Sequence, residues 1–195
     1  MTHAHQYRAS CAVEKRWAPR LDAWLELAYV VREATTEEQW RGMDRVVADG
    51  ERTYTIDYKC DERWARTGNV FVEITSNQQT GRQGWALTSE AEWLLYFLTP
   101  SRVLLLRFET LRRELTTWQR SYPIRTARNE EGYNTIGVCV PVPIVEGIAE
   151  YAADIDHRVE PFSLAKRSVP ASSLKAARDG VLDNEAGPWM DDSPA

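Results

Sequence analysis

Residues 54–59, with the sequence YTIDYK, decide how this chain is interpreted. Aromatic and β-branched residues favour an extended strand, and successive side chains of a strand point to opposite faces. Asp57 and Lys59 are two residues apart, so they project from the same face. Lys59 is also one of only four lysines among the 24 basic residues of the chain. This stretch therefore predicts a strand that holds a carboxylate and an ammonium group side by side.

A second carboxylate precedes this strand in the sequence. Asp44 begins a short apolar run, residues 44–48, and the turn sequence Asp-Gly-Glu follows at residues 49–51. Two strand-like runs joined by such a turn are typical of a β-hairpin. The hairpin is expected to bring Asp44 near Asp57.

Two carboxylates and one ammonium group on adjacent strands suit a Mg²⁺ site that hydrolyses phosphodiesters, with Mn²⁺ as a substitute. Asp44 and Asp57 would bind the metal, and the backbone carbonyl of Tyr58 could add a third oxygen. Lys59 would orient or help deprotonate the attacking water and offset charge at the phosphate, for which arginine is a poor substitute. The alternative interpretation makes Asp57 and Lys59 solvated residues of an edge strand, engaged in cross-strand ion pairs.

Further acids are candidates for the same site. Residues 6–33 show helical spacing of apolar side chains, and Glu14 borders the face that they form. Glu26 lies on a more exposed side of that helix, so Glu14 is the preferred helical acid and Glu26 the alternative. Glu73 alternates with apolar neighbours in a third strand, residues 69–74, and is interpreted as a supporting acid, a metal ligand or the partner of an arginine.

The remaining pattern predicts an α/β fold. We expect a cap and first turn near residue 36, of a short helix or an ordered loop. Beyond the third strand we expect a helix at 88–98, a strand at 102–108, a helix at 110–120, a strand at 135–142 and a short helix at 145–151. Helices before and after a mixed sheet indicate a central mixed sheet flanked by helices. Residues 1–156 are predicted to form this domain. Residues 157–195 are predicted to be a low-complexity, disordered tail, with Trp189 as a candidate contact for a protein partner.

Composition narrows the classes of function. No apolar stretch is long enough to cross a membrane and no signal-peptide core is present, so a cytoplasmic location is expected. The three cysteines and three histidines show no metal-binding spacing, which leaves carboxylate chemistry for any metal site. The net charge of −5 disfavours nonspecific coating of nucleic acid, so contacts with DNA would require arginines near the site. The candidates are Arg41, Arg45, Arg63, Arg66 and Arg82.

With these residues in view, the chain resembles the PD-(D/E)XK nuclease superfamily, the fold of many restriction enzymes and Holliday-junction resolvases. In that family a helical Glu, a strand Asp and a (D/E)-x-K on the next strand form the site, which match Glu14, Asp44 and Asp57-Tyr58-Lys59. Residues 57–74 and 85–94 also resemble small uncharacterised phage and prophage proteins of this type. The resemblance spans about residues 7–140 and departs from the pattern where Met43, and not proline, precedes Asp44.

The resemblance implies a restriction-endonuclease-like core and a metal-dependent endodeoxyribonuclease, acting on DNA that includes branched or structured forms. A resolvase activity would require a homodimer, because two strands must be cut in register. The alternative is a catalytically silent DNA-binding or assembly module of a phage, prophage or defence complex.

Overall fold

The computed structural model describes residues 10–128, 132–156 and 161–164. The helices are α1 (Ser10–Leu25), α2 (Thr36–Trp40), α3 (Trp64–Thr67), α4 (Trp85–Thr88), α5 (Phe108–Ser121) and α6 (Val142–Glu146). The strands are β1 (Val30–Glu33), β2 (Arg45–Ala48), β3 (Thr53–Asp61), β4 (Asn69–Asn77), β5 (Arg82–Gln83), β6 (Trp93–Leu98), β7 (Arg102–Arg107), β8 (Ile124–Arg128), β9 (Asn134–Pro141) and β10 (Tyr151–Asp154).

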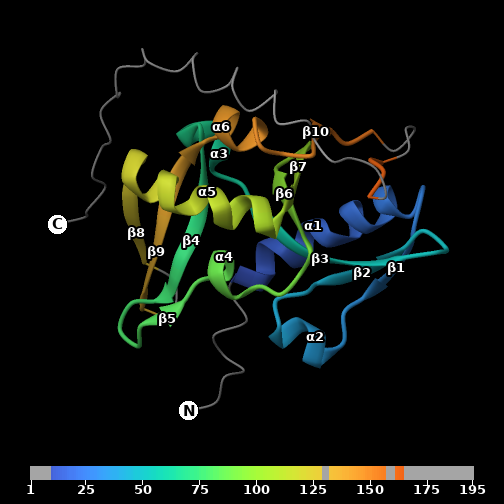
Figure 1. Cartoon of the computed structure of the whole chain (residues 1–195), viewed down its shortest axis with the longest axis horizontal. Helices are drawn as coiled ribbons and strands as arrows, with labels where there is room; N and C mark the ends of the chain where they lie inside the picture. The colour runs from blue at the N-terminus through green and yellow to red at the C-terminus, as the bar shows by residue number, and fades with distance from the viewer. Residues whose placement is uncertain (1–9, 129–131, 157–160, 165–195) are drawn as a thin grey trace.

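The strands form two sheets (Figure 1). The central sheet has six strands in the order β1-β2-β3-β6-β7-β10, and the second has four in the order β5-β4-β9-β8. Within the central sheet β3 and β6 are parallel, whereas the other neighbours are antiparallel. The chain is therefore a mixed α/β protein with a mixed central sheet flanked by helices, as the sequence predicts.

The central sheet buries both of its faces. Trp93, Leu95 and Phe97 of β6 pack into a core with α1, whereas the alternating residues of β6 pack into a second core with α5 and the inner face of the second sheet. Side chains that alternate along a strand point to opposite faces, so a strand buried on both faces is apolar throughout. The helices α1 and α5 consequently lie on opposite sides of the central sheet.

The β2–β3 hairpin and α2 form as predicted. Arg45 pairs with Ile56 and Ala48 with Thr53 in an antiparallel ladder. The side chain of Thr35 accepts a hydrogen bond from the backbone of Glu38, and the side chain of Glu38 accepts one from the backbone of Thr35, which is a capping box. These local signals involve residues close in sequence, which is why the sequence predicts them.

Two predicted helices differ from the structure, the first in its extent and the second in its type. The N-terminal helix ends at Leu25, and Val30–Glu33, predicted to be helical, is the edge strand β1 paired with β2. The helix predicted at 88–98 is the buried strand β6, preceded by the short helix α4. A continuously apolar run of this length fits a buried helix or a doubly buried strand, and tertiary packing selects the strand.

The last part of the fold also differs from the prediction. The strands predicted at 69–74 and 135–142 exist as β4 and β9, but they pair with each other in the second sheet. Strands β8 and β10 are not among the predicted elements. The helix predicted at 145–151 is wrong over most of its length, because α6 covers Val142–Glu146 and β10 begins at Tyr151. The predictions at 102–108 and 110–120 are confirmed as β7 and α5.

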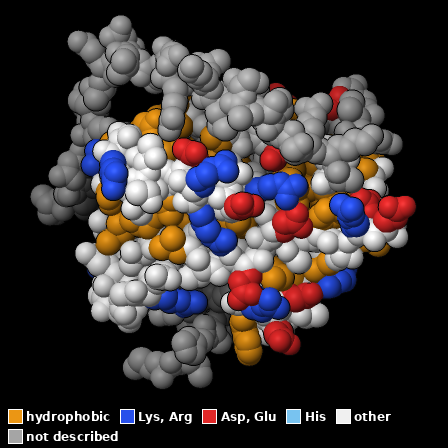
Figure 2. All heavy atoms as spheres, viewed as in Figure 1, with side chains coloured by type: hydrophobic (Ala, Val, Ile, Leu, Met, Phe, Trp, Pro, Cys, Tyr) orange, Lys and Arg blue, Asp and Glu red, His pale blue; other side chains and the backbone are white. Residues whose placement is uncertain are grey.

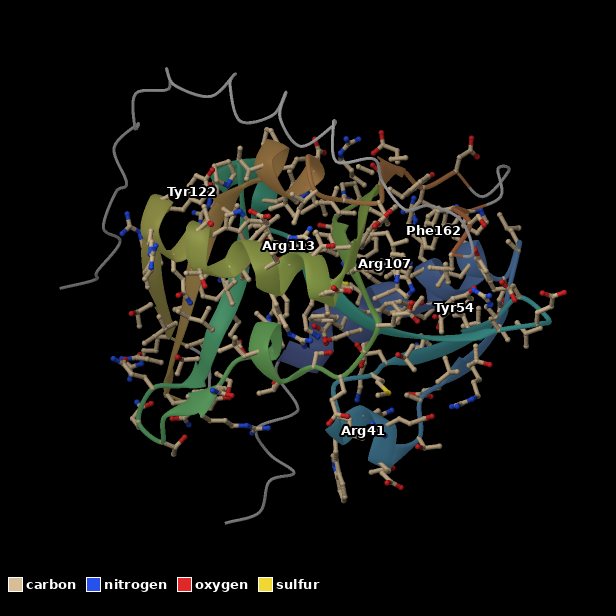
Figure 3. The ribbon with its side chains drawn as sticks, viewed as in Figure 1. Arg41, Tyr54, Arg107, Arg113, Tyr122 and Phe162 are labelled. Carbon is tan, nitrogen blue, oxygen red and sulfur yellow. The ribbon has the colours of Figure 1, made fainter. Side chains whose placement is uncertain are left out.

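The boundary predicted at residue 157 stays a prediction, because residues 157–160 and 165–195 lie outside the described part of the chain. Phe162 and Leu164, which are described, are buried in the core that contains α1. Phe162 lies beside α1, with its ring 5.4 Å from that of Trp24 (Figure 3). Among the described residues, no helix is long and apolar enough to cross a membrane.

Candidate active site

Asp57 and Lys59 form a contact pair on β3. Lys59 Nζ lies 2.5 Å from Asp57 Oδ1 and donates a second hydrogen bond to the carbonyl of Tyr58 at 2.8 Å. Asp57 is only 2% exposed, although aspartate is rarely buried without a function or a partner. The interpretation of these two residues as solvated groups of an edge strand is wrong, because β3 lies between β2 and β6 and Asp57 is buried.

Asp44 approaches this pair from the neighbouring strand. Arg45 pairs with Ile56 in the antiparallel ladder, so extending the register by one residue places Asp44 opposite Asp57. The backbone N–H of Asp44 donates to the carbonyl of Ile56 at 2.8 Å, and Asp44 Oδ2 accepts a hydrogen bond from the N–H of Tyr58 at 2.7 Å. The hairpin thus brings both predicted carboxylates together.

Glu14 reaches the same place from the first turns of α1. Its Oε1 lies 3.5 Å from Lys59 Nζ, and its side chain is 20% exposed. Leu21, Trp24 and Leu25 anchor α1 on the central sheet, so the helix holds Glu14 at the end of β3. The alternative acid, Glu26, is exposed beyond the end of the same helix.

Glu73 completes the group of acids from the second sheet. A register shift interrupts the β4–β9 ladder between Glu73 and Thr75, and such bulges often redirect a side chain beside a functional site. Glu73 Oε1 accepts a hydrogen bond from the backbone N–H of Trp85 at 3.3 Å. A Cβ atom on Gly84 would lie 2.6 Å from the Glu73 carbonyl oxygen, so this close contact requires glycine.

Trp85 is a site residue that the sequence did not predict. Its ring centroid lies 6.0 Å from Lys59 Nζ, within the range of a cation–π interaction. The ring also packs against Tyr96 and Phe108, which belong to the adjoining core. No periodicity in the sequence connects Trp85 with Lys59, because they come together only through the contact between α4 and β4.

The electrostatics of the cluster are dominated by its excess of acids. Burial, together with the charge of Asp44, raises the pKa of Glu14 to about 7 against the opposing effect of Lys59. Burial also raises the pKa of Asp57 well above its ordinary value, and Asp44 and Glu14 add to that effect. Burial by itself lowers the pKa of Lys59, but the charges of Asp57, Glu14 and Asp44 raise it well above its ordinary value. Lys59 therefore stays protonated, and the raised pKa values of Glu14 and Asp57 show that one ammonium group does not fully compensate the acids around it.

A buried ion pair supports the hairpin on the opposite face of β3. Arg45 Nε and Nη2 donate to the two carboxylate oxygens of Asp22 at 2.8 and 2.9 Å, and the Tyr58 hydroxyl donates to Asp22 at 2.9 Å. Arg45 Nη1 also donates to the carbonyl of Asp44 at 2.8 Å. Arg45 was a predicted DNA contact, but it is turned toward α1 and only 14% of its side chain is exposed. That prediction is wrong for Arg45, which instead links α1 to the strand that follows Asp44.

The donor set fits a hard divalent cation. Asp57 Oδ2 is buried and accepts no hydrogen bond, and a bound cation would satisfy such an oxygen. Within the described ranges, no three His, Cys, Asp or Glu side chains are grouped closely enough to hold a metal ion by themselves. Mg²⁺ commonly uses only one or two carboxylates and completes its shell with water and substrate oxygens. Asp44 and Asp57, with the carbonyl of Tyr58 beside them, meet that smaller requirement.

No protein-family model, no curated protein and no solved structure matches this chain.

Proposed function

We propose that the protein is a metal-dependent endonuclease that hydrolyses phosphodiester bonds of DNA, with its site at Glu14, Asp44, Asp57 and Lys59. One observation carries this proposal: the ammonium group of Lys59 contacts the carboxylates of Asp57 and Glu14, and Asp44 lies opposite Asp57 across the hairpin. A lysine beside several buried acids provides both the negative groups that attract a divalent cation and the positive group that attracts a phosphate.

Asp44 and Asp57 would hold Mg²⁺, or Mn²⁺ in its place, together with the Tyr58 carbonyl. When bound, the metal would stabilise negative charge on the phosphate and lower the pKa of a bound water. The Tyr58 carbonyl now accepts a hydrogen bond from Lys59, so Lys59 would have to turn toward the substrate as the metal binds.

Lys59 and Glu14 would have different tasks. Because its neighbours raise its pKa, Lys59 would act as a cation that orients the water and neutralises the phosphate, and not as a base. Glu14, with a pKa raised to about 7, suits the acceptance of a proton from the attacking water. The efficiency of a general base is greatest when its pKa lies near the working pH.

The order of the site residues supports membership of the PD-(D/E)XK superfamily as part of the same proposal. A helix that carries Glu14 is followed by a strand that begins at Asp44 and by a strand that carries Asp57-x-Lys59. This is the order that the resemblance implies for a restriction-endonuclease-like core. The second sheet, built from β5, β4, β9 and β8, supplies Glu73.

The competing proposal, a catalytically silent DNA-binding module, has one observation in its favour. The Lys59 ammonium group already binds Asp57 Oδ1 and the Tyr58 carbonyl, so these two oxygens are satisfied without a metal. The buried Asp57 Oδ2, which has no hydrogen-bond partner, favours the nuclease. In a purely internal ion pair both carboxylate oxygens would be expected to have partners, whereas a bound cation would satisfy this one.

A cleavage assay separates these proposals. Wild-type protein, Asp57→Asn and Lys59→Met would be incubated with supercoiled plasmid and with synthetic branched DNA, in Mg²⁺, Mn²⁺ or EDTA. The exposed Asp154→Asn on β10 serves as the matched control. The nuclease proposal predicts cutting that requires metal, is retained in Asp154→Asn and is lost in the other two variants. DNA binding without cutting by folded wild-type protein would support the silent module.

A further inference from the structure

The described arginines near the site differ in whether an acid neutralises them. Arg41 pairs with Glu90 at 2.6 Å, and Arg45 pairs with Asp22 at 2.8 Å. Arg63, which precedes α3, and Arg66 on α3 are exposed and form no ion pair with any described residue. Of the arginines predicted to contact DNA, these two therefore have guanidinium groups that remain available for a ligand.

One residue of α1, Lys15, extends this positive surface, and its neighbour Arg16 fixes the helix in place. Arg16 Nη1 lies 3.2 Å from Glu62 Oε1, and the ring nitrogen of Trp17 donates to the same oxygen at 3.0 Å. These contacts hold the beginning of α1 against the segment between β3 and α3. Lys15, which is exposed and has no ion pair within the described part of the chain, precedes Arg16. We call Lys15, Arg63 and Arg66, which have no acidic partner among the described residues, the basic rim.

The basic rim is linked to the candidate active site through α1, because Glu14 Oε1 lies 3.5 Å from Lys59 Nζ and Arg16 pairs with Glu62, the residue before Arg63. Lys15 follows Glu14 in α1, and Arg63 comes four residues after Lys59. Four residues of extended chain span about 14 Å at most, so the Cα atom of Arg63 lies within that distance of the Cα atom of Lys59. An arginine side chain covers much of such a distance. Successive phosphates of one strand rise about 3.4 Å along the duplex axis, so those that flank a scissile phosphate bound at Lys59 would lie near the rim.

Charge elsewhere on the molecule makes this surface distinctive. The face that carries α5 mixes Lys and Arg with Asp and Glu side chains (Figure 2), and the whole chain has a net charge of −5. Exposed arginine that has no acidic partner is well suited to phosphate, because its planar guanidinium can donate two parallel hydrogen bonds. In an acidic protein, DNA must be attracted locally, and the rim is positioned to do so.

We propose that the basic rim binds the backbone phosphates that flank the scissile bond of duplex DNA. This inference takes the identity of the substrate from the proposed function. Arg63 and Arg66 are three residues apart on one turn, so they would contact neighbouring phosphates from one side. Lys15 would contact the backbone on the other side of Glu14. These residues hold the duplex in register over the site and carry no sequence preference, since phosphates are the same at every step.

The test measures binding of a short fluorescent DNA duplex by anisotropy in EDTA, with NaCl varied between about 50 and 200 mM. Each lost phosphate contact should lower the slope of log K against log[salt] by about 0.9. Between about 50 and 200 mM NaCl, the factor by which affinity falls should therefore be about 12 times smaller for the double variant R63Q/R66Q than for wild type. Lys15→Gln should lower the slope by about half as much.

The matched control is R52Q/R113Q, which removes the same charge at exposed sites away from the rim. Arg52 lies in the hairpin turn, and Arg113 lies on α5 across the central sheet from α1 (Figure 3). The control should keep the wild-type slope. An unchanged slope in R63Q/R66Q, or an equal decrease in the control, would overturn the inference, as would a wild-type protein that does not bind the duplex. The binding test is done without metal, whereas the nuclease proposal is tested by cleavage in Mg²⁺. An unchanged salt slope in R63Q/R66Q is therefore distinguishable from failure of the nuclease proposal.

Discussion

The carboxylate of Asp44 accepts a hydrogen bond from the backbone N–H of Tyr58 at 2.7 Å. The main-chain ladder between β2 and β3 ends at Arg45 and Ile56, so this side chain takes the place of the next carbonyl acceptor. The residue that follows Tyr58 is Lys59, and the one before it is Asp57. Asp44 is thus attached to the middle of the motif with which it would share a metal ion.

This attachment predicts different effects for two substitutions of Asp44. Asp44→Asn keeps an oxygen acceptor for the Tyr58 N–H, so the free energy of unfolding should remain close to that of wild type while metal-dependent cleavage is lost. Asp44→Ala leaves that donor without its charged acceptor and should lower the free energy of unfolding by about 1.5–3 kcal/mol. Urea unfolding of both variants checks this difference, and equal stabilities would show that the hydrogen bond contributes little.

The raised pKa of Glu14 predicts a pH dependence of stability. In the folded protein this pKa is about 7 against an ordinary value of 4.5, so between these values the folded state binds more protons than the unfolded state. Stability therefore decreases as the pH rises from about 4.5 to 7, by at most about 3.5 kcal/mol, since one pKa unit corresponds to about 1.4 kcal/mol. Glu14→Gln should be more stable than wild type at about pH 8 and similar to it near pH 4.5.

Denaturant unfolding at several pH values measures this effect, with the exposed Glu26→Gln on the same segment as the control. The control should follow the wild-type pH dependence. If Glu14→Gln also follows it, the carboxyl group of Glu14 is not destabilised by its surroundings.

The surplus of acids predicts that Mg²⁺ stabilises the protein more at high pH than at low pH. Metal ligands must lose their protons. Burial raises the pKa of Asp57, so this carboxyl group keeps its proton to a higher pH than an ordinary aspartate. Mg²⁺ at about 100 times its dissociation constant should add about 2.7 kcal/mol of stability where the carboxylates are ionised. Thermal unfolding at about pH 6 and 8 would compare MgCl₂ with KCl of equal ionic strength. A Mg²⁺ effect that persists in Asp57→Asn would place the ion elsewhere.

The ion pair between Asp22 and Arg45 predicts that removing Asp22 greatly lowers the free energy of unfolding. Asp22→Ala would leave a mostly buried guanidinium and the Tyr58 hydroxyl without their acceptor, and should reduce the free energy of unfolding by about 3 kcal/mol or more. Glu90→Ala removes the partner of Arg41 in an exposed pair and should cost less than about 1 kcal/mol. Urea unfolding of both variants measures the contrast, and similar costs would contradict it.

What the sequence predicts correctly depends on how far apart the interacting residues are. Asp44, Asp57 and Lys59 belong to one hairpin, whose turn and alternation are visible locally, so their meeting was predictable. The position of Glu14 on the helix could be inferred, but its contact with Lys59 depends on how α1 packs across the sheet. Trp85 could not be assigned to the site, because a contact between α4 and β4 brings it there.

The errors have an equally specific origin. The apolar run of β6 has no alternation because both of its faces are buried, so its pattern does not distinguish strand from helix. The sequence shows the charge of Arg45 but not its pairing with Asp22, so it predicts a DNA contact where the structure has an internal ion pair. Neighbouring residues of a strand point to opposite faces of the sheet, so a shift of one residue turns a charged side chain from the outer face to the inner one. Only the register of the sheet determines which residues face outward.

The parallel pairing of β3 with β6 has a consequence for amide hydrogen exchange. The backbone amides of β3 are bonded between β2 on one side and β6 on the other, whereas β1 and β10 are edge strands of the same sheet. Edge strands open locally, but a strand with neighbours on both sides exchanges its amide protons mainly through unfolding of the whole domain. Because β6 follows β3 by more than thirty residues, no small fragment can reproduce this protection. Asp57 and Lys59 are thus carried by the part of the molecule whose amides should exchange most slowly.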